Sequence, residues 1–206
     1  MEVLPLITKF EDLDLNKLYT YADYLTWNFN ERVELIKGKI FKMSPAPSSY
    51  HQLISGNLHG EFKNFLKGKK CLVFSAPFDV RLTRKNALDR DVLTVVQPDL
   101  CIICDKTKID KRGCLGAPDL IVEILSPGND QIEVSKKYDL YESNGVKEYW
   151  LVFPYEGMVQ VYALNADGKY TTSVPYASGA TVRSLLFPDL ELTIESVFEG
   201  LDFDEL

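Results

Sequence analysis

Residues 120–125 read Leu120-Ile121-Val122-Glu123-Ile124-Leu125, an apolar run that is broken by a single glutamate. Such a run is typical of a central β-strand that is covered on both faces. Because side chains alternate along a strand, one face carries Ile121, Glu123 and Leu125, and the opposite face is wholly apolar. A carboxylate in this position costs free energy unless it is paired or binds a metal ion. Glu123 is therefore a partner in a buried salt bridge, a strand-end residue at the solvent, or a functional group.

The patterns on both sides of this run alternate between helix and strand. In chain order we expect a helix over 20–29, a hairpin over 33–43, a helix over 50–66, strands over 71–82, 93–104 and 119–125, a helix over 132–143, a strand over 148–153, a hairpin over 158–164 and 169–175, and a short helix within 192–206. This order predicts an α/β fold with a mixed central β-sheet flanked by helices and an additional β-hairpin.

The length and composition are those of a globular domain. The chain has 206 residues, of which 46% are hydrophobic and 26% charged, and this excludes a disordered chain, a collagen-like chain and a coiled coil. We expect an N-terminal arm over 1–19 that is loosely attached, a single domain over 20–198 and an acidic tail over 199–206. No stretch approaches the ~18 apolar residues of a membrane helix. Residues 1–5 lack a signal-peptide pattern, so a cytoplasmic location without membrane contact is expected.

The charge of the chain is unevenly distributed. The formal net charge is −7, which read alone argues against a nucleic-acid-binding protein. Residues 199–206 carry four acids and no base, and residues 1–14 carry four acids against Lys9, so residues 15–198 are neutral. Basic residues gather within 63–90 of this neutral part. Any contact with DNA should therefore depend on a metal ion and a local basic face, with low non-specific affinity.

Two further patterns bear on cofactors. Cys101 and Cys104 lie in one apolar run, three positions apart, so in a strand they point to opposite faces and do not form a zinc knuckle. We expect all four cysteines, which include Cys71 and Cys114, to be buried free thiols. The chain also lacks both glycine-rich phosphate loops, so an enzyme with a nucleotide cofactor of those types is not expected.

Asp99 and Lys137 are candidates to act with Glu123. Asp99 follows Pro98, at a point where strand pairing is disturbed, and such points are common beside active sites, although Pro-Asp is also ordinary in turns. Lys137 falls within the apolar stripe of the helix expected over 132–143, whereas Lys136 points away. An inward lysine after an inward glutamate suggests a paired site, unless its aliphatic stem carries the ammonium to solvent.

Glu34 and His51 are weaker candidates. Glu34 stands between two apolar residues, and this position suits a salt bridge as well as it suits a metal ligand. His51 opens the helix expected over 50–66, and a lone histidine there is more often a surface or capping residue than an anion ligand. Carboxylates from adjacent strands suit Mg²⁺, and a lysine beside them could stabilise the charge of a reacting phosphate. This set of groups suits metal-dependent phosphodiester hydrolysis.

Several segments in a fixed order resemble the Uma family of bacterial proteins, which are classed as restriction endonucleases with the PD-(D/E)-x-K nuclease fold. The resemblance extends over residues 31–154. The matching segments are 31–38 with 43–45, His51-Gln52, 76–81, 96–100, 116–127, Lys137 with Tyr141, and 145–152. The resemblance implies a restriction-endonuclease-like fold with a nuclease-like metal site.

The resemblance also implies roles for individual residues. Glu34, Asp99 and Glu123 resemble the metal-binding acids, and Lys137 resembles the catalytic lysine. These four are the expected catalytic residues, with Mg²⁺ or Mn²⁺ as cofactor, and His51 and Gln97 are additional candidates. The position two residues after Glu123 is Leu125 instead of the usual lysine, so Lys137 would supply the ammonium from the next helix.

Three functions are compatible with the sequence. The leading hypothesis is a metal-dependent endonuclease that hydrolyses phosphodiester bonds of DNA with a metal-activated water. A homodimer is compatible with it, since cutting both strands requires two sites. The alternative is a catalytically inactive nucleic-acid- or protein-binding module that retains the nuclease fold. A third reading is a carboxylate-pair hydrolase that acts on sugars, against which Lys137 argues mildly.

Overall fold

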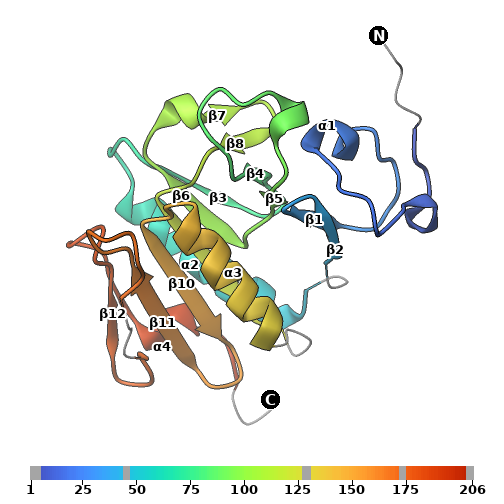
Figure 1. The fold of residues 1–206 in the computed structure, drawn as a ribbon. Helices are drawn as coiled ribbons and strands as arrows, with labels where there is room; N and C mark the ends of the chain where they lie inside the picture. Colours follow the sequence, from blue (N-terminus) through green and yellow to red (C-terminus); the bar gives the residue numbers. More distant parts are fainter. Residues whose placement is uncertain (1–5, 44–46, 127–130, 172–174, 203–206) are drawn as a thin grey trace.

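A five-stranded sheet forms the centre of the molecule (Figure 1). The computed structural model describes residues 6–43, 47–126, 131–171 and 175–202, and the side chains of all of these except 131–133. The sheet has the order β11-β10-β9-β6-β3. Its strands are β3 (Leu72–Ser75), β6 (Leu100–Ile103), β9 (Leu120–Ile124), β10 (Glu148–Phe153) and β11 (Met158–Ala163). The run quoted from the sequence is thus the middle strand, β9.

β9 is paired on both edges and covered on both faces. It runs parallel to β10 and antiparallel to β6. Helix α2 (Ser49–Phe65) covers one face and helix α3 (Gln131–Ser143) covers the other, as Figure 1 shows. A strand with this surrounding must be apolar along its length, which is the pattern that the sequence displays. The predicted α/β class, with a mixed sheet flanked by helices, is confirmed.

Side-chain alternation along β9 divides the core into two clusters. Leu120, Val122 and Ile124 pack with α2 residues that include Phe62, and Ile121 packs on the opposite face with α3 residues that include Tyr141. Each apolar side chain buried in this way stabilises the fold by about 1.5–3 kcal/mol. Glu123 follows the same alternation and lies on the α3 face, as expected from the sequence.

A second sheet of six strands adjoins the first. Its order is β2-β1-β5-β4-β8-β7. Its strands are β1 (Val33–Ile36), β2 (Lys39–Lys42), β4 (Val80–Arg81), β5 (Val95–Val96), β7 (Ile109–Asp110) and β8 (Gly113–Leu115). The hairpin predicted over 33–43 is β1 and β2.

The strands predicted over 71–82 and 93–104 are each divided between the two sheets, which corrects the prediction. β3 and β4 are separated around Pro77, and β5 and β6 are separated by Gln97, Pro98 and Asp99. Proline has no N–H to donate to a strand ladder, so pairing stops at these points and the chain changes sheet. The second of these breaks places Asp99 at the start of β6.

The N-terminal part contains a shorter helix than predicted, and some of its apolar side chains are buried. Helix α1 spans only Tyr21–Tyr24, with Thr20 as its N-cap, where a helix over 20–29 was expected. The following residues instead form an aromatic cluster, in which Trp27 stacks on Phe29. In the segment predicted as a loosely attached arm, Leu13 and Tyr19 are buried in a third core cluster, whereas Leu6, Leu15 and Leu18 are exposed.

The remaining elements each span three or four residues. They are β12 (Thr181–Arg183), β13 (Glu191–Thr193), α4 (Ile194–Val197), and the 3₁₀ turns Phe10–Asp12, Asp89–Asp91 and Lys106–Lys108. The hairpin predicted over 158–164 and 169–175 has β11 as its first strand, while its second half makes isolated bridges such as Leu164 with Tyr170. Part of that half and the end of the predicted acidic tail lie outside the described residues. Within the described chain, no helix is long and apolar enough to cross a membrane.

The prediction of four free thiols was wrong for two of them. Cys71 and Cys104 form a disulfide, whereas Cys101 and Cys114 are buried and free. The pair lies one position beyond the register pair Leu72 and Ile103 of the antiparallel strands β3 and β6, so the two sulfurs face each other. Only strand register makes these cysteines neighbours, and their separation of 33 residues in sequence does not reveal it.

Glu148, at the start of β10, is fully buried and forms hydrogen bonds with the loop before β13. Its carboxylate accepts hydrogen bonds from Trp150 Nε1, from Ser184 Oγ at 3.0 Å and from the backbone N–H of Leu186 at 2.6 Å. Burial raises the pKa of this carboxyl, and the donors around it act in the opposite direction. A carboxylate in this setting is held by hydrogen bonds instead of a counter-charge.

We expect Glu148→Ala to lower the free energy of unfolding by about 3 kcal/mol, because it leaves three buried donors without an acceptor. Urea denaturation at neutral pH measures the loss. The exposed Glu191→Ala is the control and should change stability far less. Equal stability of the two variants would mean that the Glu148 network does not support the fold.

Candidate active site

Glu123 points from β9 toward α3, where two side chains of that helix bind it. Lys137 Nζ lies 3.0 Å from Glu123 Oε1, and Tyr141 donates its hydroxyl hydrogen to the same oxygen. Lys137 Nζ also lies 3.4 Å from Oε1 of Glu34, which comes from β1. The inward stripe of α3 thus carries a lysine and a tyrosine to the only glutamate of β9. The lysine ammonium bridges carboxylates from the two sheets.

Asp99 lies beside this group, at the break between β5 and β6. Its Oδ2 accepts a hydrogen bond of 2.7 Å from the backbone N–H of Ile124, which fixes the carboxylate against the end of β9. Its Oδ1 lies 3.1 Å from Nε2 of His51. His51 sits in the first turn of α2, where its backbone N–H donates to the side chain of the N-cap, Ser48. His51 is 8% exposed, and its Nδ1 has no hydrogen-bond partner among the residues that the structure describes.

Gln97 connects the site to its rim. Its backbone N–H donates to Glu34 Oε1 at 2.9 Å. Its side-chain amide donates to Asp79 at 2.9 Å and accepts from Arg32 at 2.8 Å. Gln97 therefore contacts Glu34 through its backbone, while its side chain is engaged outside the carboxylate group.

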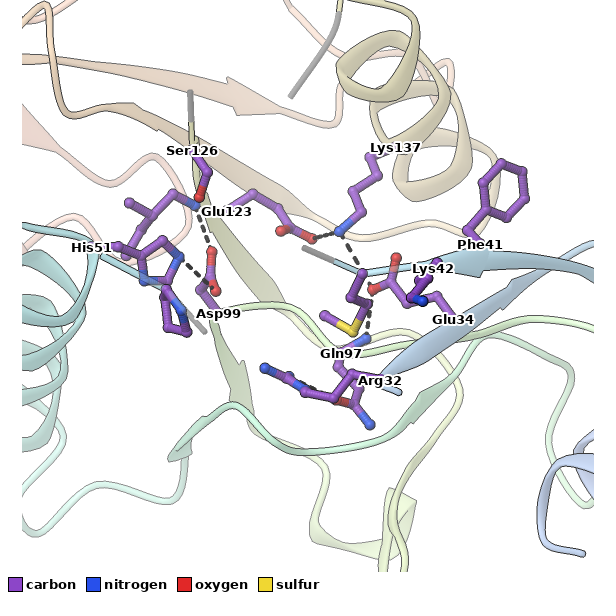
Figure 2. A pocket seen from close by; sticks show the side chains of 13 residues that line it. Arg32, Glu34, Phe41, Lys42, His51, Gln97, Asp99, Glu123, Ser126 and Lys137 are labelled. Atoms are coloured by element: carbon purple, nitrogen blue, oxygen red, sulfur yellow. Dashed lines mark hydrogen bonds and ion pairs between the residues drawn. The ribbon is translucent and has the colours of Figure 1, made fainter. Parts of the chain in front are cut away.

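A cleft of about 90 Å³ joins these residues (Figure 2). All six residues singled out from the sequence line it: Glu34, His51, Gln97, Asp99, Glu123 and Lys137. Arg32 and Lys42 add positive charge at its rim. The sequence reasoning missed Arg32 and the role of Tyr141 as a partner of Glu123. Tyr141 was visible in the apolar stripe of α3 and in the segments that resemble the family, and neither reveals a hydrogen bond.

In the interior of the cleft, around Lys137, acidic groups outnumber permanent cations, since Arg32 and Lys42 lie at the rim. Burial, together with the charges of Asp99 and Glu34, raises the pKa of Glu123 to about 7 against the opposing effects of Lys137 and Tyr141. For Lys137, burial acts to lower the pKa, but the carboxylates of Glu123 and Glu34 outweigh it and hold the ammonium charged. Burial and the Glu123 charge also keep the Tyr141 hydroxyl protonated by raising its pKa. One permanent cation therefore faces three acidic groups.

The oxygen donors suit a hard divalent cation, although they do not enclose one here. No hydrogen bond from the described residues reaches Oε2 of Glu34 or of Glu123. Carboxylate oxygens of this kind are the ligands that Mg²⁺ and Mn²⁺ prefer. Within the described chain, no three His, Cys, Asp or Glu side chains are grouped closely enough to hold a metal ion. Lys137 occupies the space between Glu34 and Glu123, so these side chains must move to enclose an ion.

Comparison with known proteins agrees with this arrangement. Residues 21–195 match the family Uma2, which is described as "Putative restriction endonuclease". The chain belongs to the Uma2 family. The match includes both sheets and every residue of the cleft named above, so the resemblance inferred from sequence segments is confirmed.

Two related proteins extend the comparison. An uncharacterized protein of Synechocystis sp. is 26% identical over 184 residues, which are 88% of this chain and 92% of that protein. The crystal structure of a protein from Anabaena variabilis, titled a "putative nuclease belonging to DUF820", matches with a TM-score of 0.66 and 24% identity. That match includes 87% of this chain and 97% of the other. At this identity the structural match shows the shared fold alone.

Proposed function

We propose that this Uma2 protein is a divalent-metal-dependent DNA endonuclease whose active site is the cleft at the end of β9. One observation carries the proposal: the carboxylates of Glu34 and Glu123 converge on one largely buried lysine, with Asp99 beside them, in a cleft that opens to the surface. A site that only stabilised the fold would pair its charges, whereas this one keeps an excess of acidic groups. The family description supports a nucleic-acid substrate.

Asp99 and Glu123 are the proposed metal ligands, with Glu34 as the third acid. Their chemistry fits Mg²⁺ or Mn²⁺ because all three supply hard oxygen donors. A divalent ion bound there supplies positive charge to a phosphate and lowers the pKa of water. Its charge would also offset the acidic excess of the cleft.

The remaining residues position these groups. Tyr141 and Lys137 hold one oxygen of Glu123 and leave the other directed away from them. His51 and the Ile124 N–H each hold one of the two oxygens of Asp99. Lys137, kept charged by its carboxylate neighbours, can donate a hydrogen bond to the attacking water or to a phosphate oxygen, where charge increases in the transition state. Arg32 and Lys42 at the rim can neutralise approaching phosphates.

A homodimer and a cytoplasmic location remain parts of the proposal. Double-strand cleavage requires two such sites, which a dimer supplies. The disulfide between Cys71 and Cys104 argues against the cytoplasmic location, because disulfides are rare in a reducing cytoplasm.

One observation favours the second candidate, a non-cleaving nucleic-acid- or protein-binding module. Lys137 already forms ion pairs with both Glu34 and Glu123, and no ready-made metal cluster is found in the described part of the chain. The two candidates differ in whether the cleft binds a divalent ion.

Calorimetric titration with Mn²⁺ distinguishes these candidates. We expect the wild-type protein to bind Mn²⁺ and Asp99→Asn to bind it at least about tenfold more weakly, because a carboxylate ligand becomes an amide. Asp167→Asn, an exposed turn substitution, is the control and should bind like the wild type. In parallel, supercoiled plasmid should be nicked with Mn²⁺ and remain intact with EDTA. Absence of Mn²⁺ binding at millimolar concentration would favour the binding module.

A further inference from the structure

A second hollow of about 530 Å³ lies next to the cleft, on the other side of Asp99. It runs between α2 and the end of β3, and it shares Arg32, His51 and Asp99 with the cleft. We call it the α2 groove. Its characteristic residues are Ser55, Gly56, His59 and Ser75. None of these takes part in the chemistry assigned to the cleft.

His59 and Ser75 form a polar pair in the α2 groove. His59 Nδ1 lies 2.6 Å from Ser75 Oγ, and Nε2 of His59 has no hydrogen-bond partner among the described residues. Ser75 pairs with Leu100, the residue after Asp99, and the N–H of Ala76 donates to the Asp99 carbonyl at 3.0 Å. The pair is thereby tied to the same strand break that positions Asp99.

The pair lies at a defined distance from the cleft along α2. His51, Ser55 and His59 are four residues apart and therefore follow one face of the helix. The eight residues from His51 to His59 correspond to about 12 Å along the helix axis. A group bound at His59 and Ser75 is thus separate from a group bound at Asp99, although both lie in one continuous depression.

The α2 groove presents hydrogen-bond donors where the cleft presents acceptors. Asp99 is the only acidic residue that lines it, against Arg32 and two histidines. If Ser75 donates to Nδ1, then Nε2 of His59 carries a hydrogen; if Nδ1 carries the hydrogen, the Ser75 hydroxyl is free to donate. Either arrangement leaves one donor for an anion. A Cβ added at Gly56 would meet no atom within 4 Å, so the floor of the groove is open to a bulky group.

We propose that the His59–Ser75 pair binds a backbone phosphate of the DNA strand that enters the cleft, at a linkage beside the one that is cut. The proposal rests on the proposed function for its substrate class. It assigns the path of that strand: along α2, past His51, and into the site at Asp99. Lys63, exposed one helical turn beyond His59, continues the same path with a positive charge.

A scan of neutral linkages tests this assignment. A short fluorescent DNA strand, alone and paired with its complement, carries one methylphosphonate linkage at successive positions. Binding is measured by fluorescence anisotropy in the presence of Mn²⁺ with full-length Glu123→Gln protein, in which cleavage is expected to be abolished. The comparison adds His59→Ala, Ser75→Ala and the control Asn64→Ala, an exposed change elsewhere on α2.

We expect one linkage position at which neutralisation weakens binding about tenfold, the effect of losing a charge-assisted hydrogen bond. His59→Ala should lose a similar factor and should no longer respond at that position, while Asn64→Ala behaves like the parent. A merely structural role for His59 would weaken binding at every linkage alike, and that result would overturn the assignment, as would an absence of DNA binding by the parent. Failure of the wild type to cleave DNA would reject the proposed function and leave this phosphate site standing.

Discussion

Glu123→Gln is expected to abolish DNA cleavage, with a loss on the order of 10³-fold or more in rate. The substitution keeps the size of the side chain and its ability to accept from Lys137 and Tyr141, but it removes the charge that would face a metal ion. The measurement is conversion of supercoiled plasmid to nicked and linear forms with Mn²⁺ or Mg²⁺. The effect should be on turnover, because the cleft otherwise keeps its shape.

The fold should survive this change. Burial already raises the pKa of Glu123 to about 7, so a neutral group at this place costs the folded state little. Thermal unfolding should therefore give a Tm for Glu123→Gln at or above that of the wild type. Glu156→Gln, an exposed substitution, is the matched control for activity. Cleavage by Glu123→Gln at the wild-type rate would remove Glu123 from the active site.

The centre of the fold was predictable because a buried strand leaves a direct mark in sequence. The run from Leu120 to Leu125 has to be apolar on both faces once α2 and α3 cover it, and the one exception, Glu123, is then conspicuous. The inward positions of Tyr141 and Lys137 were predictable too, because their helical spacing places them on the side of α3 that meets the sheet. Local periodicity thus contained much of the information on the site.

Features that depend on distant pairing were not predictable in the same way. The disulfide between Cys71 and Cys104 follows from the register of β3 against β6, and no local pattern encodes that register. The distribution of the strands over two sheets depends on what happens at Pro77 and Pro98, where sequence reveals a break but not where the chain goes next. The pair of His59 with Ser75 is a further contact of this kind.

Lys137→Met is expected to cause the largest loss of stability among the changes considered, about 3–5 kcal/mol at pH 7 in EDTA. The ammonium lies 3.0 Å from Glu123 and 3.4 Å from Glu34, and Asp99 adds a third charge close by. Methionine fills a similar volume but leaves these acids buried without a cation. Urea denaturation measures the loss, and Lys136→Met, which removes an exposed neighbour on α3, should change stability by no more than about 1 kcal/mol.

The loss should depend on pH with a defined sign. The pKa of Glu123 is about 7 in the folded protein and 4.5 in its unperturbed state, and removal of Lys137 raises the folded value further. The folded variant then binds more protons than the unfolded chain, so its stability falls as pH rises from about 4.5 through and beyond 7. Below about pH 7 Glu123 is protonated in both proteins, so the difference between Lys137→Met and the wild type should shrink there.

The same variant distinguishes two causes of the lost stability: repulsion between the acids, and the loss of packing by the lysine side chain. Adding Glu34→Gln to Lys137→Met removes one of the uncompensated charges and should recover part of the lost stability, because the two residues are direct partners. Mn²⁺ should also stabilise Lys137→Met more than it stabilises the wild type, since a divalent ion then replaces the missing cation among the carboxylates. If neither change restores stability, and the loss is independent of pH, then Lys137 supports the fold through its aliphatic stem, and the charge balance assigned to the cleft is wrong.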